Sequence, residues 1–165
     1  MKLENRERIL VADDDQSIRQ LLGTIIKRER LEVDLAPDGA EAIEHLKRRE
    51  YSVILLDLMM PRVDGFGVIQ YLRDHPQTHK PVVIVITAYA DQRFKEVDAE
   101  IVSGVLRKPF DVADVGSLVR HCMSGFKAAL QQKDAESDET LRILSTEGIE
   151  RLRTLRGEIP ENDAN

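Results

Sequence analysis

The sequence predicts an α/β fold, with a parallel β-sheet covered by helices on both faces. Strand-like and helix-like segments alternate five times along residues 1–132. This alternation is typical of parallel sheets connected by right-handed crossovers. Residues 53–56 (Val-Ile-Leu-Leu) are apolar without interruption, as expected for a central strand buried on both faces.

Apolar runs and helical spacing give the expected order of elements. The second strand alternates and should lie near a sheet edge, and Asp15, Asp38 and Asp111 are placed to cap helices. The strands are expected at 9–12, 31–35, 53–56, 81–86 and 102–106. The apolar positions of the helices lie at 18–26, 42–46, 66–72, 94–97 and 115–130.

Composition restricts the class of protein. The chain is 42% hydrophobic with no run long enough to span a bilayer and no signal peptide, so we expect a cytoplasmic protein without membrane contact. Cys122 is the only cysteine, which excludes an intramolecular disulfide and a thiolate metal cage. A net charge of −6 with 4% aromatic residues argues against nucleic-acid binding and favours a metal cation or a protein partner.

Residues 133–165 differ from the domain expected over residues 1–132. They begin with a polar run, 133–139, that predicts a linker, and continue with leucine and isoleucine spacing over 141–155 that predicts a short amphipathic helix. Nine acidic and five basic residues give this tail a net charge of −4, unlike a DNA-binding arm. No DNA-binding output domain is expected after residue 132.

Five chemically active side chains follow the predicted strands. Asp13 and Asp14 follow the first strand, Asp57 the third, Thr87 the fourth and Lys108 the fifth. The carboxyl ends of parallel strands share one sheet edge, so these side chains should converge. Three neighbouring carboxylates require a counter-charge, and oxygen ligands suit Mg²⁺. Each residue alone could be a cap or turn residue, but their joint placement favours a functional site.

This set of groups is suited to phosphoryl transfer. A carboxylate beside a divalent cation, a lysine and a hydroxyl can attack a phosphoryl group to give an aspartyl phosphate. Asp57 is the expected nucleophile because it stands alone after the central strand. Asp13 and Asp14 are expected on the metal side.

These motifs resemble the receiver domain of two-component response regulators over roughly residues 7 to 130. The resemblance implies a flavodoxin-like fold with strand order 2-1-3-4-5 and phosphorylation of Asp57 by a histidine kinase or histidine phosphotransfer protein. It also implies signalling through a downstream protein rather than enzymatic turnover. The residues that carry it are Asp13-Asp14, Asp57 to Pro61, Asp64-Gly65, Thr87-Ala88 and Lys108-Pro109-Phe110.

The same resemblance implies roles within the site. Asp14, Asp57 and the main-chain carbonyl of Met59 would hold Mg²⁺, with Asp13 assisting through water. Lys108, across a cis bond to its proline, would contact the phosphoryl group. Thr87 would move toward that group and report its presence.

The sequence departs from the usual receiver pattern at the switch. Val105 stands three residues before the lysine, where receivers usually carry Tyr or Phe, so the usual coupling of threonine to an aromatic ring is not expected. Tyr89 could shield the site or take part in switching, or be a loop residue without such a role. The apolar Met59 would not orient an attacking water, which suggests a long-lived phosphoryl group.

Other functions remain open from the sequence. An Mg²⁺-dependent phosphohydrolase could use Asp13 as its nucleophile and Asp15 as its acid–base group, because such enzymes usually place these two aspartates two residues apart just after a strand. A pseudo-receiver scaffold would take up no phosphoryl group. The output surface is expected on the fourth helix, fifth strand and fifth helix, and the tail could cover it, pair two chains or be a remnant linker.

Overall fold

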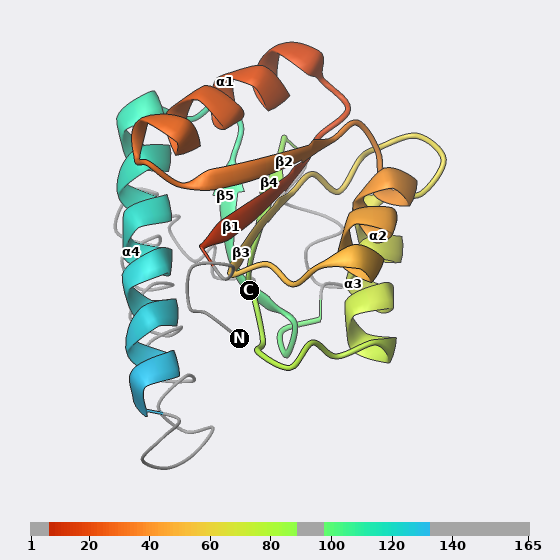
Figure 1. The fold of residues 1–165 in the computed structure, drawn as a ribbon. Coiled ribbons are helices and arrows are strands. Elements are labelled where there is room, and N and C mark those ends of the chain that lie inside the picture. Colours follow the sequence, from red (N-terminus) through yellow and green to blue (C-terminus); the bar gives the residue numbers. More distant parts are fainter. Residues whose placement is uncertain (1–6, 89–97, 133–165) are drawn as a thin grey trace, which may run out of the picture.

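The computed structural model describes residues 7–88 and 98–132, and within them five strands form one parallel sheet (Figure 1). Their order, β2-β1-β3-β4-β5, confirms the expected topology and places β2 at an edge. Every pairing between neighbouring strands is parallel. The strands are β1 (Arg8–Ala12), β2 (Glu32–Ala36), β3 (Val53–Leu56), β4 (Val82–Thr87) and β5 (Val102–Arg107).

Helices cover both faces of the sheet, as the apolar run of β3 predicts. In Figure 1, α1 and α4 lie on one side and α2 and α3 on the other. Each pair encloses its own cluster of buried apolar side chains, and all four residues of β3 are buried between these clusters. The helices are α1 (Gln16–Arg28), α2 (Gly39–Arg48), α3 (Gly65–Asp74) and α4 (Val112–Gln132).

Each helix is capped by an aspartate at its amino end, as expected for Asp15, Asp38 and Asp111. The carboxylates of Asp15, Asp38 and Asp64 accept hydrogen bonds from main-chain N–H groups in the first turns of α1, α2 and α3. The cap at Asp64 was not predicted from the sequence. Asp111 accepts one from Ala113 at the start of α4. Each bond satisfies a donor that the helix itself leaves unpaired.

The sheet hydrogen bonding continues one residue past the strands at the carboxyl edge. The N–H of Asp57 donates to the carbonyl of Ala12 at 2.8 Å, and the N–H of Asp13 donates to that of Ala36 at 3.1 Å. Both acidic residues are therefore anchored in the sheet by their main chains, which fixes where their side chains begin.

Some expectations fall on residues outside those described. These are the helix over 94–97, Tyr89 and the tail at 133–165. The boundary at residue 132 accordingly remains a prediction. In the described part of the chain, no helix combines the length and apolar character needed to cross a membrane.

Candidate functional site

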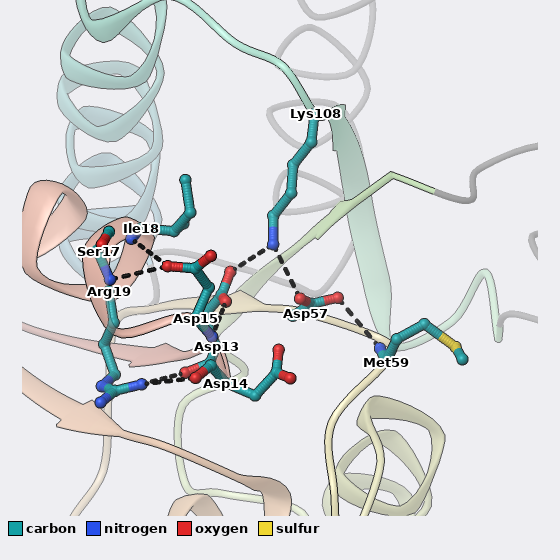
Figure 2. A network of polar contacts seen from close by, with 9 residues as sticks. All are labelled: Asp13, Asp14, Asp15, Ser17, Ile18, Arg19, Asp57, Met59 and Lys108. Atoms are coloured by element: carbon teal, nitrogen blue, oxygen red, sulfur yellow. Dashed lines mark hydrogen bonds and ion pairs between the residues drawn. The ribbon is translucent and has the colours of Figure 1, made fainter.

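The side chains singled out from the sequence all lie at the carboxyl edge of the sheet. Asp13 follows β1, Asp57 follows β3, Thr87 ends β4 and Lys108 follows β5. Figure 2 shows Lys108 reaching down between the carboxylates of Asp13 and Asp57. Residues separated by up to 95 positions in the sequence therefore meet at one point.

Lys108 bridges two buried carboxylates. Its Nζ lies 2.7 Å from Oδ2 of Asp13 and 2.9 Å from Oδ2 of Asp57. Burial raises the pKa of the Asp13 carboxyl, and the hydrogen bond from Lys108 only partly opposes this effect. Burial alone would lower the pKa of the Lys108 ammonium, but the two carboxylates outweigh it and raise that pKa. The ammonium therefore stays charged at neutral pH and neutralises part of the site.

Asp14 completes a group of three carboxylates. One oxygen from each of Asp13, Asp14 and Asp57 lies within 4.8 Å of the other two. Asp14 is exposed whereas the other two are buried, so the group opens to solvent on one side. Hard oxygen donors with an open side fit Mg²⁺, which binds through few protein ligands and retains several waters. The metal role of these residues remains a prediction.

The loop after Asp57 folds back onto the phosphoacceptor candidate. The N–H of Met59 donates to Oδ1 of Asp57 at 3.1 Å, and the N–H of Gly65 donates to the carbonyl of Leu58 at 3.0 Å. A Cβ on Gly65 would lie 2.4 Å from the carbonyl oxygen of Asp57, so only glycine fits there. The Met59 side chain is 44% exposed, as expected for a residue at the mouth of the site.

Thr87 and Lys108 are connected through their main chains. Thr87 is fully buried, and its carbonyl accepts a hydrogen bond from the N–H of Lys108 at 3.0 Å. The peptide bond between Lys108 and Pro109 is cis, as the resemblance implies. Val105 is buried in the core cluster that α2 and α3 cover, so this position packs inward without an aromatic ring. A switching role for Thr87 remains a prediction.

The structure assigns Asp15 a capping function. Its Oδ1 accepts hydrogen bonds from the N–H groups of Ser17 and Ile18 at 2.8 and 3.1 Å. These bonds lower the pKa of the Asp15 carboxyl. Figure 2 shows its carboxylate directed to the start of α1.

Two arginine contacts near the site were not predicted from the sequence. Arg19 donates to the carbonyls of Asp13 and Asp14, and Arg62 pairs with the buried carboxylate of Asp38. Neither is part of a motif. The position of Arg19, one helical turn after the cap residue, was the only available signal, since it directs a side chain back toward the preceding turn.

Comparisons with known proteins agree with this geometry. A profile of the response regulator receiver domain matches residues 9–120. The 3',5'-cyclic-nucleotide phosphodiesterase regA of Dictyostelium discoideum is 30% identical in an alignment 142 residues long, which covers 78% of this chain and 18% of that protein. The probable transcriptional regulator ycf27 of Porphyridium aerugineum is 35% identical over 116 residues, which are 70% of this chain and 47% of that protein. The chain thus spans less than half the length of either relative.

A solved structure gives the same fold. The response regulator protein TrrA of Thermotoga maritima, in complex with Mg(2+)-BeF, superposes with a TM-score of 0.62 at 28% sequence identity. The superposition covers 70% of this chain and 98% of that one.

Proposed function

This chain belongs to the receiver-domain family of response regulators, and we propose that Asp57 is its phosphoacceptor. The phosphoryl donor would be a phosphohistidine on a histidine kinase or a histidine phosphotransfer protein. The observation that carries this proposal is the Lys108 ammonium held between the buried carboxylates of Asp13 and Asp57, with Asp14 beside them.

Three side chains would have separate roles in the phosphoryl transfer. An oxygen of Asp57 forms a bond to phosphorus while the bond between phosphorus and the donor nitrogen breaks, and the leaving imidazole nitrogen takes up a proton from solvent. Lys108, already 2.9 Å from the nucleophilic carboxylate, would turn its charge toward the incoming phosphoryl oxygens. The hydroxyl of Thr87, at the end of the adjacent β4, would donate a hydrogen bond to another of these oxygens.

The three carboxylates would also hold a divalent cation. Asp14, Asp57 and the carbonyl of Met59 would be its protein ligands, with Asp13 assisting through water. The bound Mg²⁺ would neutralise charge on the transferred phosphoryl group. The Mg(2+)-BeF complex of TrrA, a similar protein, is in keeping with this assignment.

The phosphohydrolase alternative has less support. It needs Asp15 as an acid–base group two residues after a nucleophilic Asp13, but the Asp15 carboxylate already caps α1 through two hydrogen bonds. It would also leave the Lys108 contact with Asp57 without a function. The phosphodiesterase named above shares only 18% of its length with this chain, so its activity is not transferred here.

We place the output of the switch on a protein-contact surface that includes β5 and α4, where α4 is the fifth helix expected from the sequence. Val105, on β5, is buried in the core cluster that α2 and α3 cover, so a movement of Thr87 would have to reach the output surface without the usual aromatic ring. Residues 1–132 would form the receiver, and residues 133–165 a linker and helical tail. Phosphorylation could signal through formation of a homodimer, with either this surface or the tail as the dimer contact.

The decisive experiment is intact mass spectrometry after incubation with acetyl phosphate, with Mg²⁺ or with EDTA. We expect a gain of one phosphoryl group with Mg²⁺, and no gain in Asp57→Asn. Asp13→Asn serves as the second variant, because a phosphohydrolase would lose its nucleophile there. Phosphoryl uptake that survives Asp57→Asn but disappears in Asp13→Asn would refute the assignment in favour of the phosphohydrolase. No uptake under any condition would favour the pseudo-receiver scaffold.

We further propose that the phosphoryl group is long-lived. The thioether of Met59 offers no strong hydrogen bond with which to orient a water at the site mouth, and its side chain is 44% exposed. The decay of the phosphorylated mass after removal of acetyl phosphate should take minutes or longer. A half-life of seconds for the isolated protein would contradict this proposal.

A further inference from the structure

We propose that Arg19 is a positioning residue that holds the turn between β1 and α1 so that the carboxylates of Asp13 and Asp14 face Asp57. This inference rests on the proposed function, because the placement of the carboxylates matters for the binding of a cation. Arg19 itself is not expected to touch the cation or the phosphoryl group.

The contact is made through main-chain oxygens. Nη1 of Arg19 donates to the carbonyl of Asp13 at 2.7 Å and to that of Asp14 at 3.3 Å (Figure 2). These carbonyls lie in the turn, beyond the last residue of β1 and before the capping residue Asp15. One half-buried guanidinium therefore fixes two consecutive peptide groups, and with them the direction in which both side chains leave the main chain.

The rest of the turn is also held, but only on its flanks. The N–H of Asp13 is fixed by Ala36 of β2, and Asp15 is fixed by its role as the cap of α1. Oδ1 of Asp13 accepts from the N–H of Asp15 at 2.9 Å. Among residues 7–88 and 98–132, Arg19 makes the only side-chain hydrogen bond to the Asp14 main chain. Asp14 is also the exposed member of the carboxylate group. Its position is therefore the most dependent on Arg19.

Positioning and charge have opposite consequences for Mg²⁺ binding. As a positive charge close to the site, Arg19 repels a cation, and its removal would strengthen binding. As a positioning residue it maintains the carboxylate geometry, and its removal weakens binding. Outer contacts of this kind typically change metal affinity by about tenfold to a hundredfold. The sign of the change therefore separates the two roles.

The test uses the full chain and three variants, Arg19→Met, Arg19→Lys and Arg28→Met. Arg28 is exposed in the last turn of the same helix, far along α1 from the site, and serves as the matched control. Thermal unfolding followed by circular dichroism at increasing Mg²⁺ gives the Mg²⁺ dissociation constant, because a ligand that binds the folded state stabilises it by RT ln(1 + [Mg²⁺]/Kd). This readout does not depend on phosphorylation. A purely structural role of Arg19 would lower the midpoint of thermal unfolding without metal but would leave the Mg²⁺ dissociation constant unchanged.

We expect Arg19→Met to raise the Mg²⁺ dissociation constant by about tenfold, and Arg28→Met to leave it unchanged. Arg19→Lys keeps the charge and a nitrogen donor, but its side chain is shorter and ends in an ammonium instead of a planar guanidinium. It should therefore hold the two carbonyls less well and give a smaller rise, which provides the answer if Arg19→Met does not fold. An unchanged or lower Mg²⁺ dissociation constant in the Arg19 variants would overturn this inference and leave the proposed function standing. If the parent chain shows neither Mg²⁺-dependent stabilisation nor phosphoryl uptake, the proposed function fails, and the inference with it.

Discussion

Replacing Lys108 with methionine should destabilise the metal-free protein substantially at neutral pH. The substitution preserves most of the volume of the side chain but removes the ammonium that lies 2.7 Å from Asp13 and 2.9 Å from Asp57. Those two carboxylates are 1% and 6% exposed, so water cannot replace the lost partner efficiently. Removal of one member of a buried ion pair leaves an uncompensated charge.

The magnitude follows from these contacts. Hydrogen bonds to charged groups contribute about 1.5–3 kcal/mol each, and breaking a buried pair costs about 3–5 kcal/mol. Because the Lys108 side chain is 19% exposed, we expect the lower end of that range, about 3 kcal/mol. For a domain of this size, that loss corresponds to roughly 10 °C in the midpoint of thermal unfolding.

The assay is urea unfolding followed by circular dichroism at pH 7, with EDTA and with Mg²⁺. The variant carries one more negative charge at the site, so Mg²⁺ should stabilise it more than it stabilises the parent. Lys47→Met is the matched control, because Lys47 also forms a close ion pair, 2.6 Å from Glu44, but with both side chains 52% exposed. That variant should not differ measurably from the parent.

A loss below about 1 kcal/mol for Lys108→Met in EDTA would refute this reasoning, because the pair would then behave like an exposed ion pair. An equal Mg²⁺ effect in variant and parent would show that the lysine does not share the carboxylates with a cation.

Three further predictions concern other parts of the domain. Burial of Asp38 raises the pKa of its carboxyl, but the hydrogen bonds from the Glu41 N–H and from Arg62 outweigh burial, and the pKa is lowered overall. The ionised carboxylate therefore stabilises the folded protein above about pH 4, and this stabilisation is lost as pH falls through the lowered pKa. Asp38→Asn should cost roughly 1 kcal/mol at pH 7, since Arg62 is largely exposed, and an equal difference at pH 3 in urea unfolding would contradict this. Burial raises the pKa of Cys122 to about 12, so Ellman's reagent should label it at pH 8 only in denaturant, and rapid labelling of the native protein would be the contrary result. Gly65→Ala should cost about 1–3 kcal/mol through overpacking against Asp57, whereas Gly125→Ala in α4, with no atom within 4 Å of the added Cβ, should be neutral or stabilising in the same unfolding assay.

Most of the fold could be predicted because it depends on local patterns. The uninterrupted apolar run of β3 required cover on both faces, and the alternating pattern of β2 placed it at an edge; both expectations are confirmed. The caps at Asp15, Asp38 and Asp111 were also predictable, since a helix needs acceptors for its first N–H groups whatever its tertiary surroundings. The strand order itself came from the resemblance to receivers.

The membership of the site was predictable for a similar reason. Parallel strands bring their carboxyl ends to one edge, so the residue after each strand is placed once the strands are known. Asp13, Asp57 and Lys108 meet there as expected. Their catalytic and metal-binding roles, and those of Thr87 and Met59, remain predictions to be tested by the experiments above.

The sequence by itself determined the elements, their caps and the group of side chains at the sheet edge, because these depend on periodicity and on the ends of strands. Only the tertiary structure decided which atoms meet. It placed the Lys108 ammonium on Asp13 as well as Asp57, and it directed Arg19 to the carbonyls of the acidic turn. These contacts depend on side-chain rotamers and on the approach of loops distant in the chain, and no local pattern encodes either.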